Sequence, residues 1–369
     1  MPFTRRNCLK LISTIPVMAA LPARYTRADT TLKYMCWEGY NDPKVISSFA
    51  SEHHAQLDIE LIVDSPAGFS TLLSTMENAF DVVSIDSPWV SLMGQEKLCR
   101  PLDVNEFKDV FSHLYEQFSH PFTPLIQHGQ ISGIPTRWGL IGPTINTLYS
   151  DQQEFESYAP CFDAKYRGQI GIMDWGDWPI MPIALYAGVN PYQQLDDYQL
   201  KAIREAVRAL FKNKPVFFSD LSLAQQSLLD GSIKSLIGTG TFLSSSLRKA
   251  GFRQIKTVVP SPINGLKQSI IWLEASAITT KTKNHELAKK LLKHLVSSQA
   301  AFHLSLTDYA CNLSTNRHVE SLYTPDQRSI LQLDEAKAAW DKSFFHTLSP
   351  SITDLLALWQ EELFLSGLL

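Results

Sequence analysis

Five short stretches of this chain place tryptophan or tyrosine beside a carboxylate, and most of them follow a segment that we predict to be a strand. They contain Trp37, Glu38 and Tyr40; Asp86 and Trp89; Asp174, Trp175, Asp177 and Trp178; Trp272 and Glu274; and Asp308 and Tyr309. Aromatic faces attract ammonium groups, by on the order of 2 kcal/mol when desolvated, and a carboxylate adds a charge-assisted hydrogen bond. Brought together, these side chains would form a cage for an organic cation, and a small polyamine suits it better than a sugar or a metal ion.

Each stretch taken alone also has a structural interpretation. Trp and Tyr near strand ends are ordinary core and rim residues. Asp86 is placed to cap a helix that begins at Pro88, and Asp174 and Asp177 are placed to cap the helix that follows them. Glu274 is different, because an unpaired carboxylate on an otherwise apolar strand is costly. We expect a ligand to be its partner, and the cage hypothesis rests on the five stretches together.

The elements that must position these residues alternate between short apolar runs and amphipathic helices from Thr31 onward. This alternation predicts α/β layers with largely parallel sheets. Asp42 and Pro43 predict the start of the first helix. Further predicted elements are a strand at 57–63, a helix at 69–76, a buried strand through Val82, Val83 and Ile85, and a helix that starts at Pro88. In such an open sheet, the site is expected at the carboxyl ends of the strands.

The segment 131–147 mixes extended apolar residues with Pro and Gly, as expected where a chain crosses between two lobes. We interpret Arg137, Trp138 and Gly139 as hinge structure. The predicted second-lobe elements are strands at 170–173, 216–218 and 233–237 and helices at 178–186, 198–211 and 221–229. The chain then returns to a strand at 270–278 and a helix at 285–296. We predict a first lobe at 29–137 plus 261–325, a second lobe at 138–260, and a C-terminal helical segment at 326–369 that packs on the lobes.

The first residues predict export. TRRNCLK at 4–10 is followed by an apolar run from Leu11 to Leu21 without acidic residues, which is the form of a twin-arginine signal. The run is far below the roughly 20 apolar residues that span a bilayer. We expect cleavage after Ala28, with Ala23 as the alternative, and a free periplasmic protein.

Composition excludes several classes of function. The whole chain has 33 basic and 37 acidic residues, and loss of the five basic residues in 1–28 leaves a formal charge of −9. This balance argues against nucleic acid and mildly favours cationic ligands. With 369 residues, 44% of them hydrophobic, the chain is long enough for two domains. The four remaining cysteines match no metal motif, and the sequence leaves open whether they stay thiols or form a disulfide. They are Cys36, Cys99, Cys161 and Cys311.

Five motifs carry a resemblance to a known family. They are CWEGYNDP at 36–43, FDVVSIDSPWV at 80–90, ISGIPTRWG at 131–139, SIIWLEASAI at 269–278 and KNHELAKKLLKHLVSS at 283–298. In their order and spacing the chain, from about Leu32 to its C-terminus, resembles the periplasmic spermidine/putrescine-binding proteins, which belong to the extracellular solute-binding family. The resemblance implies an α/β, type II-like two-lobe periplasmic-binding-protein fold that closes on its ligand. It also implies a monomer without cofactor or catalytic activity, with ABC transporter permease subunits as partners.

The resemblance also implies roles for individual residues. Trp37 and Tyr40 fall on the family's first aromatic pair, and Trp272 falls on the aromatic residue of the last hinge strand. Glu274 falls where the family has an aspartate that holds an amine, and Tyr309 fits a further cage position. The family's acids at the start of the second lobe's first helix align with Asp174 and Asp177 or, one residue away, are replaced by Trp175 and Trp178.

The sequence departs from the family pattern at three positions. Pro88 replaces an expected aromatic residue, with Trp89 next to it; Asp86 replaces a small hydroxyl residue; and Thr239 replaces a tryptophan. These departures leave open a binder of another ligand, such as thiamine, a quaternary amine, an iron complex or an organic anion. An enzyme with a cysteine nucleophile, like the thiaminase of the same fold, is the alternative of another class, but no base accompanies any cysteine in a recognisable motif.

Overall fold

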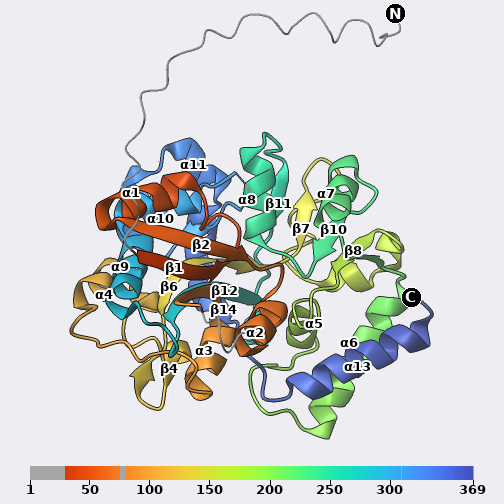
Figure 1. Ribbon diagram of the computed structural model, residues 1–369. Helices are drawn as coiled ribbons and strands as arrows, with labels where there is room; N and C mark the ends of the chain where they lie inside the picture. The colour runs from red at the N-terminus through yellow and green to blue at the C-terminus, as the bar shows by residue number, and fades with distance from the viewer. Residues whose placement is uncertain (1–29, 75–79, 309, 369) are drawn as a thin grey trace, which may run out of the picture.

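The first sheet of the molecule gathers strands from both ends of the chain. The computed structural model describes residues 30–74, 80–308 and 310–368. The sheet contains β1 (Thr30–Cys36), β2 (Ala55–Leu61), β3 (Val82–Asp86), β6 (Ile134–Ile141), β12 (Ser269–Ile278), β13 (Leu313–Ser314) and β14 (Ser343–Phe345). Its order is β13-β6-β12-β3-β1-β2, with β14 also paired to β12 (Figure 1). β1 is parallel to β2 and β3, whereas β12 is antiparallel to β3 and β6. The carboxyl ends of β1 and β3 therefore lie at one edge.

Local sequence explains the first helix. Asp42 accepts a hydrogen bond from the Lys44 backbone N–H, and Pro43 occupies the first turn of α1 (Pro43–His53). Val45 and Phe49 are one turn apart and both are buried. The predicted start of this helix is confirmed, and it sets the turn at 37–42 that connects it to β1.

The second sheet is formed by the middle of the chain. It contains β7 (Thr144–Asn146), β8 (Ile170–Met173), β9 (Val216–Phe218), β10 (Ser235–Ile237) and β11 (Ile255–Thr257), in the order β11-β7-β10-β8-β9. β8 is parallel to β9 and β10, and β7 is antiparallel to both of its neighbours. Figure 1 shows this sheet beside the first one rather than stacked on it. The predicted α/β architecture with two sheets is confirmed.

The chain passes between the two sheets twice. It leaves the first sheet at the end of β6, enters the second at β7, and returns between β11 and β12. Residues 138–141 of β6 still pair with β12, so this strand runs through the predicted lobe boundary between 137 and 138. The two longest strands of the first sheet thus lead directly to the crossings, and side chains at their ends lie where the two sheets meet.

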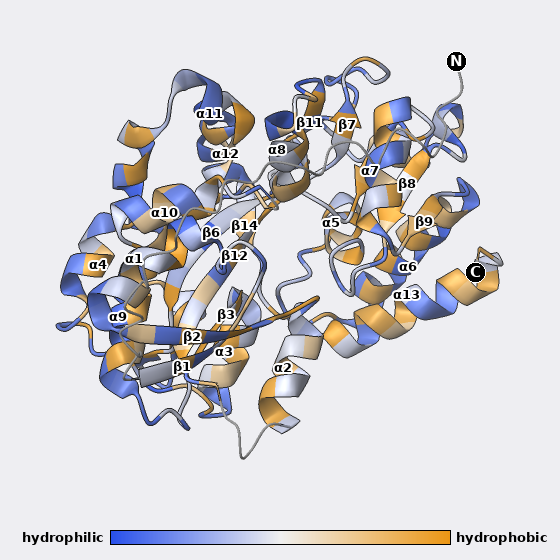
Figure 2. Cartoon of the chain, turned by 45° about the horizontal axis from the view of Figure 1, so that its top comes forward, coloured by the Kyte–Doolittle hydropathy of each residue, from blue (hydrophilic) through white to orange (hydrophobic). Residues whose placement is uncertain are grey.

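The second lobe contains α5 (Ile180–Tyr186), α6 (Asp197–Lys212), α7 (Leu221–Asp230) and α8 (Thr241–Lys249). The C-terminal helix α13 (Ile352–Ser366) begins beside the start of α6, where the Ser351 hydroxyl accepts a hydrogen bond from the Leu195 backbone N–H at 3.0 Å. Trp359 on α13 is buried against Phe211 of α6, with ring centroids 4.9 Å apart. Figures 1 and 2 show α13 lying along α6 with hydrophobic residues over much of its length. A helical C-terminal segment packed on the body is therefore present.

The remaining elements pack around the first sheet or, late in the chain, against the second lobe. They are α2 (Ser65–Ser74), α3 (Ser87–Gln95), α4 (Lys108–His113), α9 (His285–Leu295), α10 (Ser298–Ser305), α11 (Pro325–Ile330), α12 (Leu333–Ala338) and the hairpin of β4 (Ile126–Gln127) and β5 (Gln130–Ile131). Short one-turn helices occupy several of the connections. Within the part of the chain that the structure describes, no helix combines the length and apolar character needed to cross a membrane. The predicted export signal lies outside the described residues.

Candidate functional site

The candidate site is built at the carboxyl edge of the first sheet. Trp37 and Tyr40 lie in the turn after β1, and Asp86 is the last residue of β3. In the antiparallel register of β3 and β12, Glu274 is the direct Cα partner of Asp86. Three of the five predicted stretches are thus brought to one edge, although 188 positions separate the two carboxylates in the sequence.

Glu274 is fully committed to side chains of this protein. Arg137 donates from Nε to Glu274 Oε2 at 2.8 Å and from Nη2 to Oε1 at 3.0 Å. The Tyr40 hydroxyl donates to Oε2 at 2.7 Å, and the Arg137 guanidinium lies 4.5 Å from the centre of the Tyr40 ring. All three side chains are buried. The carboxylate that the sequence predicts to need a partner has one, and it is Arg137.

Arg137 was predicted to be hinge structure, and this ion pair was not predicted. β6 and β12 are adjacent and antiparallel, and Leu273 pairs with Trp138, so the next positions along the two strands, Glu274 and Arg137, come side by side where the register shifts. A usable signal was present in the sequence, because a cation and an anion both stood on apolar strands that needed neighbours. Both carboxylate oxygens of Glu274 are thus taken by Arg137, which argues against a direct contact of Glu274 with the ligand.

Asp86 has a different environment. It precedes α3 in the N-cap position, but its side chain makes no capping hydrogen bond; Oδ2 instead accepts a hydrogen bond from the Ser65 hydroxyl at 2.7 Å. Burial and the nearby charge of Glu274 raise the pKa of Asp86 to about 7. Among the described residues, no Lys, Arg or His forms an ion pair with it. The capping interpretation of Asp86 is therefore wrong, and its carboxyl group is partly buried without a cation.

The two acids of the second lobe also differ from each other. Asp174 is exposed, and Asp177 Oδ2 lies 2.9 Å from His346 Nε2. Burial lowers the pKa of His346, but the charge of Asp177 outweighs it and leaves that pKa raised. The His346 backbone N–H donates to the Ile271 carbonyl at 2.8 Å, which ties this histidine to β12. The pair thus joins the second lobe to a strand of the first sheet.

Four aromatic rings meet where the lobes join. Trp178 lies 6.5 Å from Trp272 and 5.9 Å from Phe242, and Phe242 lies 6.1 Å from Trp272 and 6.0 Å from Trp175 between ring centroids. Trp272 comes from β12, whereas the other three come from the second lobe. Its indole packs over Gly139, where a β carbon would lie 2.7 Å from ring atom Cζ2. We call Trp175, Trp178, Phe242 and Trp272 the aromatic cluster; Phe242 was missed by the sequence analysis.

The other predicted aromatic residues are not joined to this cluster. Trp89 packs against Phe69 at 5.3 Å, and Trp37 packs at the edge of the first hydrophobic core. Within the described ranges, no ring contact links either of them to the aromatic cluster. Trp37 and Trp89 therefore lie outside the aromatic cluster.

The remaining predicted site residues lie apart from the carboxylates. Thr239 is fully buried, and its hydroxyl donates to the Thr144 hydroxyl at 3.3 Å. Asp308 is exposed and pairs with Lys249 at 2.7 Å. Tyr309 lies outside the described residues. Among the described residues, no hydrogen bond or ion pair joins Thr239 or Asp308 to Asp86.

The four cysteines are buried free thiols, and no disulfide joins them. Burial raises the pKa of Cys161 to about 12 and that of Cys311 to about 11, and it raises the pKa of Cys36 as well. A nucleophilic cysteine needs a lowered pKa and a neighbouring base. These environments therefore oppose a cysteine-nucleophile mechanism. In residues 30–74, 80–308 and 310–368, no cluster of three His, Cys, Asp or Glu side chains could hold a metal ion.

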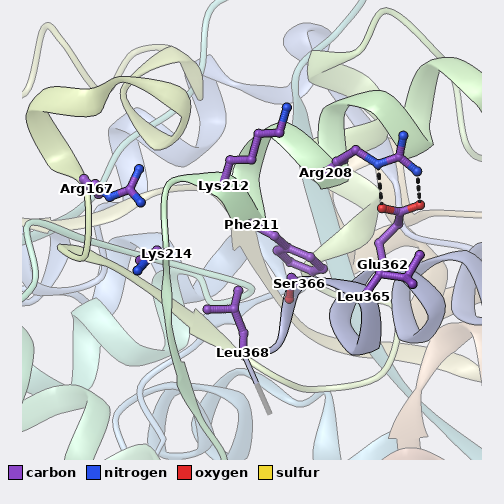
Figure 3. A pocket seen from close by; sticks show the side chains of 9 residues that line it. All are labelled: Arg167, Arg208, Phe211, Lys212, Lys214, Glu362, Leu365, Ser366 and Leu368. Atoms are coloured by element: carbon purple, nitrogen blue, oxygen red, sulfur yellow. Dashed lines mark hydrogen bonds and ion pairs between the residues drawn. The ribbon is translucent and has the colours of Figure 1, made fainter.

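A pocket of about 570 Å³ lies elsewhere, between the carboxyl ends of α6 and α13. Figure 3 shows Arg167, Lys212 and Lys214 around it and Arg208 paired with Glu362. Cations in the last turn of a helix are favoured by the helix dipole, which accounts for Lys212 without a ligand. The pocket shares no residue with the candidate site.

Comparison with known proteins identifies the class. Residues 44–310 match the family described as bacterial extracellular solute-binding protein, and the chain belongs to this family. It is 22% identical to the spermidine/putrescine-binding periplasmic protein of Escherichia coli over 293 residues, which cover 79% of this chain and 80% of that protein.

Solved structures share the fold. The spermidine/putrescine ABC transporter substrate-binding protein of Streptococcus pneumoniae superimposes with a TM-score of 0.70 at 16% identity, covering 90% of this chain and 99% of that one. PBP MotA from A. tumefaciens B6, in complex with glucopine, gives 0.66 at 13% identity, covering 90% and 99%. The fold is the two-lobe periplasmic-binding-protein fold, as predicted, and it accommodates ligands of different chemistry.

Proposed function

We propose that this protein is the substrate-binding component of an ABC importer that captures a small organic amine between its lobes. The observation that carries the proposal is the partly buried, cation-free carboxyl group of Asp86 at the same sheet edge as Trp37 and near the lobe junction. A buried carboxylate without a cation is costly, and an ammonium group would relieve that cost. The names of the relatives make putrescine and spermidine the first ligands to test.

Delivery of the ligand to the permease depends on closure of the two lobes. The ligand binds better between closed lobes than between open ones, and this difference in affinity shifts the population toward the closed form. The closed form is then the one that docks on the permease. The aromatic cluster suits such a role, because Trp272 of β12 meets Trp178 and Phe242 of the second lobe and these contacts change whenever the lobes separate.

The predicted lobes at 29–137 plus 261–325 and at 138–260 are retained in this proposal, as is export through the twin-arginine signal. Replacing Arg5 and Arg6 by Lys should keep the protein out of the periplasm, since the paired arginines define that route. Cell fractionation measures the outcome, and a periplasmic double-Lys variant would refute the predicted route.

A thermal-shift screen tests the ligand class. A ligand that binds only the folded protein raises its melting temperature. The screen contains putrescine, spermidine, spermine and agmatine, at least one of which should raise the melting temperature in a saturable way, and thiamine, whose response alone would favour a different ligand. If none of the first four does, the proposal fails.

A second candidate function is that of a binding protein with the same fold but a different ligand. The observation that favours it is the pairing of Glu274 with Arg137, because this leaves one carboxylate fewer for a polyamine. The glucopine complex of MotA shows that similar folds serve other ligands. The same screen extended to organic anions and opines distinguishes the two candidates.

A further inference from the structure

We infer that Arg137 determines the specificity of the site: by neutralising Glu274 it leaves Asp86 as the carboxylate of the first sheet that receives the ammonium group of the ligand. The inference rests on the proposed function, because it assumes that the ligand is an organic amine. It assigns the ammonium group of the ligand to Asp86 on β3, the strand next to β12, which carries Glu274.

Glu274 has little capacity to accept a further cation. Its Oε2 already takes Arg137 Nε at 2.8 Å and the Tyr40 hydroxyl at 2.7 Å, and its Oε1 takes Arg137 Nη2 at 3.0 Å. The Arg137 and Glu274 side chains are 2% and 6% exposed, so water screens their charges poorly. An ammonium group placed at Glu274 would lie beside the guanidinium and be repelled by it.

Asp86 has the opposite properties. Among the described residues, Ser65 is the only one whose side chain donates a hydrogen bond to Asp86, and none of their cations pairs with it. The residue is partly exposed, whereas Glu274 is buried. Asp86 and Glu274 are direct partners across β3 and β12. A cation bound at Asp86 would therefore lie one strand away from the position of Glu274.

Among the acidic groups near the site, Asp86 is the one whose protonation a bound cation can change. Glu274 raises its pKa, His346 lowers it and Asp177 raises it. Glu274 forms an ion pair with Arg137, and Asp177 is hydrogen-bonded to His346. Both neighbouring acids are therefore already paired, while burial keeps the pKa of Asp86 at about 7, so that half of the molecules carry a proton there near neutral pH.

Isothermal titration calorimetry with putrescine and spermidine as probes tests the inference. At pH 8, Asp86→Asn should weaken binding of the better probe at least 30-fold. The double variant Arg137→Met with Glu274→Gln removes the ion pair as a unit and should cost less affinity than Asp86→Asn, because Asp86 still holds the ammonium group. Asp326→Asn, in an exposed ion pair away from the site, is the control and should bind like the wild type. If the double variant loses as much affinity as Asp86→Asn, or if Asp86→Asn binds normally, the assignment to Asp86 is wrong.

A second measurement needs only the native protein. At pH 7, binding of an ammonium at Asp86 should release about half a proton, since the bound form holds the carboxylate ionised. Titrations in two buffers of different ionisation enthalpy measure this release, and Asp86→Asn should abolish it. Binding without proton release overturns the inference alone, whereas a wild-type protein that binds neither probe overturns the inference together with the proposed function.

Discussion

Arg137 Nε lies 2.8 Å from Glu274 Oε2, and this buried ion pair joins two neighbouring strands, β6 and β12, that lead to the crossings between the lobes. The pair occupies the position where the family resemblance implied a ligand amine. The pair makes a predicted binding carboxylate part of the framework of the site. The changes in unfolding free energy caused by replacing Arg137 and Glu274 should therefore not be additive.

Replacing Arg137 alone by Met should lower the free energy of unfolding by about 3–5 kcal/mol, because Glu274 is left buried without a cation. The double variant with Glu274→Gln should recover most of this loss. Denaturant titration measures both. Arg253→Met is the matched control, since its exposed pair with Asp326 should contribute about 1 kcal/mol or less. Equal losses for the two single variants would contradict the role of the buried pair.

The affinity for an amine should increase with pH. The amine stays protonated below pH 9, whereas Asp86, with a pKa of about 7, changes from mostly protonated at pH 6 to mostly ionised at pH 8. The affinity for putrescine should therefore rise about tenfold between these values. Asp86→Asn should bind weakly at both values, without this rise. A flat profile for the wild type would mean that the ligand does not use Asp86.

Asp86→Asn should also stabilise the unliganded protein at pH 8. The pKa of Asp86 in the folded state is above that of the unfolded chain, so ionisation costs folding stability progressively between about pH 4 and pH 7. The Asn variant lacks this cost and should be more stable than wild type at pH 8, by on the order of 1–2 kcal/mol after allowance for partial exposure. The difference should vanish near pH 4. Denaturant titration at both pH values measures it, and a destabilised variant at pH 8 would contradict the assignment.

His346 should stabilise the protein most at low pH. Its pKa is raised in the folded state by Asp177, so its contribution is complete below the unfolded pKa of about 6.5 and is lost as pH rises through the folded pKa. His346→Gln should therefore lower stability at pH 6 by about 1–2 kcal/mol more than at pH 9. Melting curves at the two pH values compare the variant with wild type, with His303→Gln at a partly exposed position of α10 as the control. A pH-independent difference would show that the charged pair contributes nothing.

Phe242→Ala should weaken amine binding without changing its pH dependence. Phe242 contacts Trp175, Trp178 and Trp272, so its removal loosens the ring contacts between β12 and the second lobe but alters no charge. We expect a loss of about 1 kcal/mol in binding free energy, or roughly fivefold in affinity. Calorimetry at pH 6 and pH 8 checks both statements. Phe364→Ala, on the exposed surface of α13, serves as the control.

Much of the fold follows from local sequence. β8 and β9 begin and end at the predicted residues, β12 differs by one residue, and α1 begins at Pro43 after its predicted cap. These elements have strong local signals: apolar runs, a capping aspartate and a proline in the first turn. The helix α8 and the strand β14 lack such signals and were not predicted, since their formation depends on packing against β6 and β12.

The site was predictable in its residue types but less so in its pairings. Asp86, Trp272 and Glu274 do reach the carboxyl edge and the lobe junction. The partners Arg137 and His346 come from segments 137 and 169 positions away from Glu274 and Asp177, and no local pattern relates residues over such distances. The register shift between β6 and β12 falls at Glu274, where one residue of β12 lies opposite two residues of β6, and no local pattern indicates such a shift.

Recognition of an organic cation through its charge, and not through shape alone, can be measured by calorimetric titration at pH 8 with putrescine or spermidine beside the uncharged isostere 1,4-butanediol. We expect saturable one-to-one binding of at least one amine and no measurable binding of the diol. Absence of binding by both amines, or equal binding of the diol, would contradict it.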